Sequence, residues 1–300
     1  MANQKPLGSE EVTQLFPGKK QVSLKGLYLD QKLAGLAGTI GRPLVIADYI
    51  TDKNGLVAIK SDSGRWRVPP EIKNSSDWRL FQELLAQADL AISSSAYLKG
   101  VAASGKPSQD ILFQFEPGGE YEELGDWRLS AGFKNRSPDL AFLTHHLDFK
   151  FPVGLLGGGR RIFIFTTDAV ANSDAAAPFR AAGVEVVGSG ETGVDGDRLI
   201  EYLQAGLGYH VIMLTTGPSV LDLLLHSNHL DLLYISEAQM EIPFEDPATV
   251  RTILSAGIKP NELEDFVLTH KVLQENVRTD VGSFISQVFL RFDRKGLLSN

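Results

Sequence analysis

Cysteine is absent from the 300-residue chain. Its absence excludes a disulfide framework, a thiolate nucleophile and any zinc or iron–sulfur site built on cysteine. Apolar runs are short as well, and none approaches the ~20 residues that span a bilayer. The first residues, MANQKPLG, carry no charged segment followed by an apolar one, which indicates no signal peptide. We therefore expect a cytoplasmic protein with no membrane partner.

Positive charge is also in short supply. Lysine and arginine number 29 against 37 aspartates and glutamates, so the formal net charge is −8. Nucleic-acid binding without sequence preference depends on lysine and arginine against phosphate, so we expect no nucleic-acid partner. A hydrophobic share of 43% is typical of a globular chain.

The six histidines show no metal-ligand spacing. His145 and His146 are adjacent, so in an extended segment they point to opposite faces and cannot chelate one ion. His226 and His229 are three residues apart, but the expected start of a strand near Leu230 breaks their shared helical face. The sequence therefore predicts no metal site.

Short apolar runs alternate with helical patterns from Arg42 onward. This alternation predicts an α/β fold with a mostly parallel central sheet, flanked by helices on both faces as a three-layer sandwich. We expect one domain over residues 42–300, preceded by an N-terminal arm over 1–41 whose glycine-rich end, 33–41, is a surface loop. The expected strands are 44–47, 56–59, 89–92, 140–143, 161–165, 184–187, 210–214, 230–235 and 287–292.

Three further segments carry local predictions. Ser75 or Ser76 is expected to cap a helix, because a hydroxyl accepts from the free amides of a first turn. Residues 116–137 are acidic and rich in glycine, which favours a solvated loop. Residues 248–256 are expected to be helical.

Two segments compete as phosphate-binding candidates. Gly188–Gly193 (GSGETG) matches the dinucleotide pattern, but three further residues delay the helix that the third glycine should pack against. We interpret it as a strand-to-helix loop. Thr216–Val220 (TGPSV) instead joins an apolar strand directly to a helix, whose free first amides and dipole favour an anion. Ser219 and Asp222 are alternatively a capping box, which is compatible with ligand binding.

Several of these segments, taken in order, resemble one family. They are RPLVIA (42–47), NGLVA (54–58), PDLAFLT (138–144), FRAAGVEVV (179–187), VIMLTTGPS (211–219) and LDLLYI (230–235). The order resembles the pyrimidine reductase domain of riboflavin biosynthesis, with its dihydrofolate-reductase-like fold, over residues 42–292. The resemblance implies an NADPH-dependent reductase that transfers a hydride to a ribosylaminopyrimidine or a related small molecule, and a homodimer.

The resemblance also implies site residues. Asn54, Arg79 and Thr215 fall on the substrate side. The cofactor side comprises Ser94, Ser95, Tyr97, Thr144, His145, Thr166, Thr167, Thr216, Gly217, Pro218, Ser219 and Val220.

A reductase also needs a proton donor for the product oxygen or nitrogen. Asp48 and Asp52, near the end of the first parallel strand, are the catalytic candidates. The chain departs from the family mainly on the substrate side, where Asn54 replaces an aspartate, Leu85 an arginine and Thr215 a glutamate. A non-catalytic nucleotide-binding protein on the same scaffold is therefore the alternative function.

Overall fold

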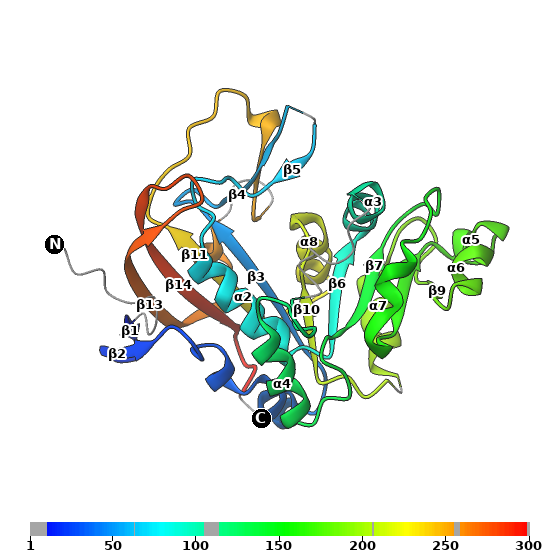
Figure 1. The fold of residues 1–300 in the computed structure, drawn as a ribbon, viewed down its shortest axis with the longest axis horizontal. Helices are drawn as coiled ribbons and strands as arrows, with labels where there is room; N and C mark the ends of the chain where they lie inside the picture. Colours follow the sequence, from blue (N-terminus) through cyan, green and yellow to red (C-terminus); the bar gives the residue numbers. More distant parts are fainter. Residues whose placement is uncertain (1–10, 63, 105–113, 206, 255–258, 299–300) are drawn as a thin grey trace. The chain divides into compact units, whose positions relative to one another are not determined.

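The computed structural model describes residues 11–62, 64–104, 114–205, 207–254 and 259–298. The chain divides into two compact units, and it passes between them several times along the sequence (Figure 1). Unit 1 contains the residues up to Lys32, Asp48–Glu83 and Asp231 onward. Unit 2 contains Leu33–Ala47 and Leu84–Leu230.

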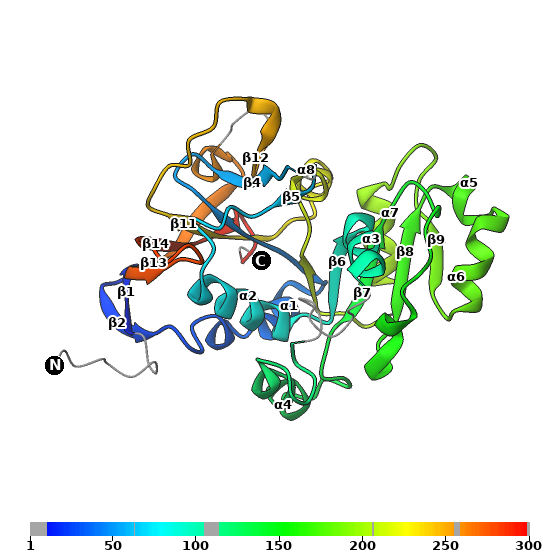
Figure 2. The same cartoon turned by 45° about the horizontal axis from the view of Figure 1, so that its top comes forward.

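Unit 2 is built on a parallel sheet. The first half of β3 (Leu44–Thr51) pairs with β10 (Val211–Leu214), and the order continues through β6 (Leu90–Ser94), β7 (Asp139–Leu143), β8 (Ile162–Thr166) and β9 (Glu185–Gly188). Every residue of β3, β8 and β10 is buried, as expected for strands covered on both faces. This confirms the predicted parallel sheet; Figure 2 shows β6, β7, β8 and β9.

Helices and short 3-10 turns connect these strands. They are α1 (Leu33–Ile40), α3 (Ser95–Ser104), α4 (Glu122–Ser130), η3 (Val153–Gly159), α5 (Asp168–Ala171), η4 (Asp174–Ala176), α6 (Ala177–Ala181), α7 (Gly196–Gln204) and α8 (Pro218–His226). Another helix, α2 (Ser75–Gln87), begins in unit 1 and ends in unit 2.

Unit 1 is mainly antiparallel. Its larger sheet has the order β2 (Lys20–Ser23), β1 (Glu11–Phe16), β13 (Phe266–Arg278), β14 (Phe284–Arg294) and β11 (Leu232–Ala238). A small sheet joins β12 (Val250–Thr252), β4 (Leu56–Lys60) and β5 (Trp66–Arg67). The 3-10 turns are η1 (Leu29–Gln31), η5 (Pro247–Thr249) and η7 (Pro260–Glu262).

The chain before Lys32 is anchored into unit 1. The Glu83 carboxylate accepts from the backbone amides of Gly26 and Tyr28 at 2.6 and 3.0 Å. Gln31 Oε1 accepts from the Tyr234 hydroxyl at 2.6 Å and from Arg291 Nη1 at 2.9 Å. These buried and charge-assisted bonds hold the segment onto α2, β11 and β14.

The surface loop expected over 33–41 is wrong. The segment forms α1, in which Leu33 and Ala37 are buried, and the Leu33 amide donates to Gln87 Oε1 at 3.0 Å. Burial of one helical face outweighs the low intrinsic helix propensity of its two glycines.

The solvated loop expected over 116–137 is also wrong in part, because Glu122–Ser130 forms α4. Leu124 and Arg128 of this helix are buried, and Arg128 Nη1 donates to the carbonyls of Ala86 and Ala88 at 2.8 and 2.6 Å. The local composition did not indicate that Arg128 would be buried and bonded to backbone carbonyls.

Two smaller expectations are corrected as well. The helix expected near 248–256 is instead η5 and β12, with residues 255 and 256 outside the described part. The cap of α2 is Asn74 rather than Ser75 or Ser76. Its Oδ1 accepts from the Asp77 amide at 2.9 Å, and its Nδ2 donates to Gln287 Oε1 at 2.7 Å. Asparagine caps as well as serine does, and here it also bonds to β14.

Candidate functional site

Unit 2 collects the predicted cofactor residues at one edge of its sheet. Thr216 follows β10, Ser94 ends β6, Thr144 follows β7 and Thr166 ends β8. These four strands are neighbours in the order β10, β6, β7, β8, and all of them are parallel. Their carboxyl ends therefore lie side by side, at the edge where open parallel sheets bind ligands.

Some hydroxyls at this edge already serve the local fold. The Thr144 hydroxyl donates to the carbonyl of His146 at 2.8 Å and accepts from its amide at 3.3 Å. The Thr167 hydroxyl accepts from the Val170 amide and caps α5. The Thr215 hydroxyl donates to the carbonyl of Ile92 at 3.1 Å. These three side chains therefore stabilise the backbone at this edge of the sheet.

Two other hydroxyls at the edge are buried without a hydrogen-bond partner in the described part of the chain. They belong to Thr166, fully buried at the end of β8, and Ser189, just after β9. The two residues are neighbours, since the Ser189 amide donates to the Thr166 carbonyl at 2.9 Å. Buried hydroxyls normally have a partner, so this place suits a polar ligand group or a water.

The first turn of α8 is open. Gly217 is the N-cap, Pro218 occupies the first helical position, and no side chain caps the helix. A side-chain carbon added at Gly217 meets no atom within 4 Å. Ser219 lies within the first turn, so the capping box with Asp222 is wrong. Among the described residues, no side chain accepts a hydrogen bond from the first amides of the helix, and the space beside Gly217 is open, which fits a phosphate group.

The competing loop, 188–193, is closed on itself. A side-chain carbon added at Gly190 meets the Gly193 carbonyl oxygen at 2.0 Å, and the Gly190 carbonyl accepts from the Asp168 amide at 2.8 Å. The helix α7 begins only at Gly196, capped by the Asp195 side chain, which accepts from Arg198. The backbone leaves no cradle for a pyrophosphate, in agreement with its interpretation as a loop.

His145 lies against this loop. A side-chain carbon added at Gly193 meets His145 Cε1 at 3.2 Å. His145 and His146 are both exposed, with ring centres 6.4 Å apart. Tyr97, also predicted on the cofactor side, stacks on Phe142 of β7 with ring centres 6.0 Å apart. Aromatic and imidazole rings thus flank the carboxyl end of β7.

In unit 1 the predicted catalytic residue Asp48 is buried close to a second carboxyl group, that of the half-buried Asp77. Asp48 lies on β3, is 8% exposed, and its Oδ1 has no hydrogen-bond partner in the described part of the chain. Burial and the nearby Asp77 carboxylate raise the pKa of Asp48 well above its usual value. Burial also raises the pKa of Asp77, in the first turn of α2, to about 6.

Tyrosines enclose the same region. Tyr28 and Tyr234 pack with ring centres 4.9 Å apart. Burial and the Asp48 carboxylate raise the pKa of Tyr28, and burial also raises the pKa of Tyr234. Low-dielectric surroundings favour the neutral form of a carboxyl group, so this pair binds a proton more tightly than exposed carboxyl groups do. The sequence analysis did not identify Asp77 as a candidate site residue, because an aspartate in the first turn of a helix is already explained by its favourable interaction with the helix dipole.

Asp52, the other catalytic candidate, has a structural role. Its Oδ1 accepts from the amides of Asn54 and Leu56 at 2.8 and 2.9 Å, and its Oδ2 accepts from the Ile242 amide at 3.0 Å. Three backbone donors hold both oxygens, so the side chain fixes the turn after β3 and is poorly suited to donate a proton.

The predicted substrate residues are divided between the units. Asn54 is exposed at the turn between β3 and β4 in unit 1. Arg79 Nε pairs with Glu83 Oε1 at 2.9 Å, so its charge is neutralised within α2. Thr215 belongs to unit 2 and bonds to Ile92, as described above. The structure does not bring these three residues together within one unit.

Among the described residues, no group of three or more histidines, aspartates or glutamates is placed to hold a metal ion. In the same part of the chain, no helix has both the length and the apolar character needed to cross a membrane.

Solved structures of pyrimidine reductases share this fold. The chain matches a pyrimidine reductase-like protein from Corynebacterium diphtheriae with a TM-score of 0.54 and 20% identity, over 86% of this chain and 94% of that one. It matches the riboflavin biosynthesis reductase of Saccharomyces cerevisiae with a TM-score of 0.51 and 16% identity, over 90% and 98% of the two chains.

A third match, RibD of Acinetobacter baumannii, has a TM-score of 0.53 and 12% identity, and it covers 85% of this chain but only 58% of that one. No family model matches the sequence, and no curated protein matches it. The chain therefore has the dihydrofolate-reductase-like α/β fold of the pyrimidine reductases. The resemblance seen in the sequence is confirmed at the level of the fold.

Proposed function

We propose that the protein is an NADPH-dependent reductase that transfers a hydride to a ribosylaminopyrimidine or a related small molecule. The observation that carries this proposal is the open first turn of α8 at Gly217, at the sheet edge where β10, β6, β7 and β8 end. A dinucleotide needs such a place for its pyrophosphate. The fold shared with pyrimidine reductases supports the choice of reaction.

The residues at this edge fit the cofactor. The amides of Gly217 and Ser219 would hold the pyrophosphate, because neither has a capping side chain in front of it. The unpartnered hydroxyl of Thr166 offers a buried polar contact. When bound, NADPH supplies a hydride from its nicotinamide ring to the electrophilic carbon of a C=N or C=O bond.

The proton that completes this reduction comes, in the proposal, from the Asp48–Asp77 pair of unit 1. Hydride addition leaves a negative charge on nitrogen or oxygen, and one proton neutralises it. A carboxyl group with a raised pKa keeps a proton at higher pH than an exposed carboxyl group and can donate it, whereas the three amides bound to Asp52 require an acceptor. Asp48, rather than Asp52, is the preferred donor.

Cofactor binding and turnover test the proposal separately. NADPH and NADH are titrated into the full chain by calorimetry, and NADPH oxidation is then followed with ribosylaminopyrimidine and pterin substrates. We expect tight NADPH binding, weaker NADH binding, and oxidation with at least one substrate. Absence of binding by either nucleotide would remove the reductase proposal.

A non-catalytic nucleotide-binding protein is the second candidate. It is favoured by the predicted substrate residues, because Arg79 is neutralised by Glu83 and the Thr215 hydroxyl is bonded to Ile92. NADPH binding without oxidation in the presence of any tested aminopyrimidine or pterin would support this candidate.

The resemblance also implies a homodimer, and we propose that state for the chain in solution. Light scattering coupled to size-exclusion chromatography measures the mass directly. The mass of a single chain, 32.7 kDa, across the tested concentrations would contradict the dimer.

A further inference from the structure

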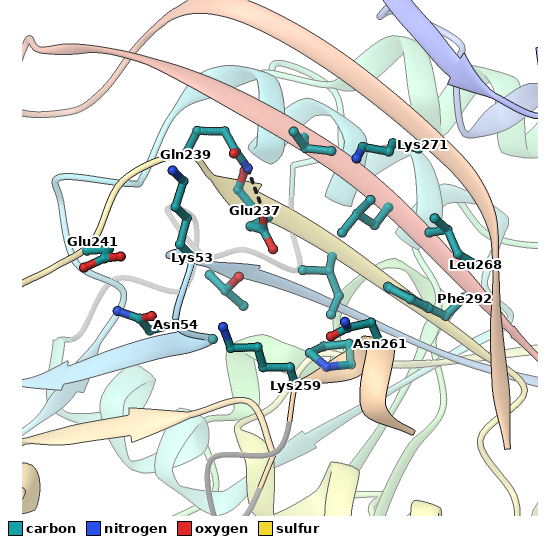
Figure 3. A pocket seen from close by; sticks show the side chains of 16 residues that line it. Lys53, Asn54, Glu237, Gln239, Glu241, Lys259, Asn261, Leu268, Lys271 and Phe292 are labelled. Atoms are coloured by element: carbon teal, nitrogen blue, oxygen red, sulfur yellow. Dashed lines mark hydrogen bonds between the residues drawn. The ribbon is translucent and has the colours of Figure 1, made fainter. Parts of the chain in front are cut away.

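Unit 1 contains a hollow that the cofactor proposal does not use. Its volume is about 520 Å³, and all of its lining residues belong to unit 1 (Figure 3). Ile235 of β11 and Val288 and Phe292 of β14 give it a buried apolar floor. This volume and this lining are typical of a pocket for a small organic molecule.

Three lysines surround the floor. Lys53 comes from the turn after β3, Lys259 precedes η7 and Lys271 lies on β13 opposite Leu290. Figure 3 shows them placed around Glu237 of β11. Within the described part of the chain, none of the three ammonium groups has an ion pair or a hydrogen bond.

The charges of the hollow do not balance. It also contains Glu237 and Glu241, so three cations face two carboxylates. Glu237 Oε1 already accepts from Gln239 Nε2 at 2.7 Å. Lys271 is partly buried, and a cation next to apolar surface without a partner is costly. An anionic group on a ligand would compensate this charge.

We propose that this hollow binds a small aromatic molecule that carries an anionic group. The ring packs on the apolar floor near Leu268 and Phe292, and the anion is held by the lysines (Figure 3). The exposed carboxylate of Glu241 disfavours a second anionic group on its side. Asn54, which the resemblance placed on the substrate side, also lines the hollow, but the proposed binding requires neither NADPH nor hydride transfer.

The probe pair for this proposal is anilinonaphthalene sulfonate and its uncharged parent, phenylnaphthylamine. Each is titrated into the full chain, and fluorescence is recorded. We expect the sulfonate to saturate one site per chain. Lys259→Gln and Lys271→Gln should each weaken its binding about tenfold, which is the loss of one charge-assisted contact. Binding of the uncharged parent should change less than about twofold.

Lys60→Gln is the matched control, because Lys60 is exposed on β4 in the same unit but does not line the hollow. It should leave sulfonate binding unchanged. Three results would overturn the proposal: no saturable binding, equal loss in the Lys60 variant, or equal effects on both probes. NADPH titration of the same variants separates the two proposals, since sulfonate binding without NADPH binding would leave this one standing.

Discussion

The carboxylate of Asp52 accepts a hydrogen bond from the backbone amide of Ile242 at 3.0 Å, across 190 positions of sequence. Together with its bonds to the amides that follow it, this contact joins the end of β3 to the segment after β11. Asp52 thus stabilises the fold of unit 1, although the sequence analysis placed it among the catalytic candidates.

Asp52→Ala should therefore reduce stability strongly. Three backbone amides would lose their acceptor, and each unsatisfied buried donor costs about 1–3 kcal/mol, so we expect a loss of about 3 kcal/mol or more. Urea denaturation measures it. Asp62→Ala, at an exposed aspartate of the same unit, is the control and should change stability by less than about 0.5 kcal/mol. Equal stability of the two variants would contradict the structural role.

The cap of α2 gives a second comparison. Asn74→Ala removes the cap on Asp77 and the buried bond to Gln287, so it should cost about 2 kcal/mol. Ser75→Ala, at the exposed residue that the sequence favoured, should be nearly neutral. Thermal unfolding of both variants distinguishes the two caps, and a larger loss in the Ser75 variant would refute the assignment.

The carboxyl groups of Asp48 and Asp77 predict a pH dependence of stability. The folded pKa of Asp77 is about 6, above its usual value, so the folded state binds a proton more tightly than the unfolded state. Its contribution is favourable below about pH 4 and is lost as the pH rises through about 6. Asp77→Asn should remove this loss and raise stability at pH 8 by a few kcal/mol.

Denaturant unfolding at several pH values checks this result. Asp62→Asn, which changes an exposed carboxyl group, should keep the pH dependence of the original chain. A pH profile for Asp77→Asn that follows the original one would show that this carboxyl is not the titrating group. In the reductase assay, the same variant should flatten the limb of the rate profile near pH 6 if the pair supplies the proton.

The open corner at Gly217 predicts the effect of adding a side chain there. Gly217→Val fills the space that the pyrophosphate needs, and we expect NADPH binding to weaken about a hundredfold or more. Gly157→Val is a matched control, because both glycines have extended conformations (φ −69°, ψ 177° and φ −70°, ψ 162°) and open surroundings. Similar NADPH affinities for both variants would place the cofactor elsewhere.

The closed loop predicts the opposite behaviour at Gly190. Gly190→Ala places a carbon 2.0 Å from the Gly193 carbonyl oxygen, so the backbone must move, and we expect a loss of about 3 kcal/mol. Gly217→Ala meets no atom and should fold normally. Circular dichroism melts compare the two; a neutral Gly190→Ala would mean that the loop is open.

The parallel half of the fold was predictable from the sequence. Strands such as β8 and β10 are buried on both faces, so in the sequence they are continuous apolar runs. Glycine and threonine residues next to these runs mark where the strands end. Among the antiparallel strands, β11 and β14 were predicted in part, as 230–235 and 287–292, whereas β1, β2 and β13 were not. Most of β13 (FVLTHKVLQENVR) alternates irregularly between buried and exposed residues, and its pairing is interrupted by register shifts. No local sequence pattern therefore predicted β13.

The candidate site divides in the same way. The Thr216–Val220 corner was recognisable because strand, glycine and helix follow each other directly in the sequence. The relation between Asp48 and Asp77 was not, because it arises only when β3 and α2 pack together. The lysines around the hollow likewise come from three distant segments.

The passage of the chain between its units bears on synthesis at the ribosome. Every segment of unit 2 has been made once Leu230 emerges, whereas Thr13 of unit 1 must wait for Leu273, its partner on β13. A nascent chain would therefore carry β1, with the exposed Leu15 and Phe16, paired with β2 alone for most of translation. The other edge of β1 lacks its partner during that time, and such open strand edges are where chaperones are needed and where aggregation begins.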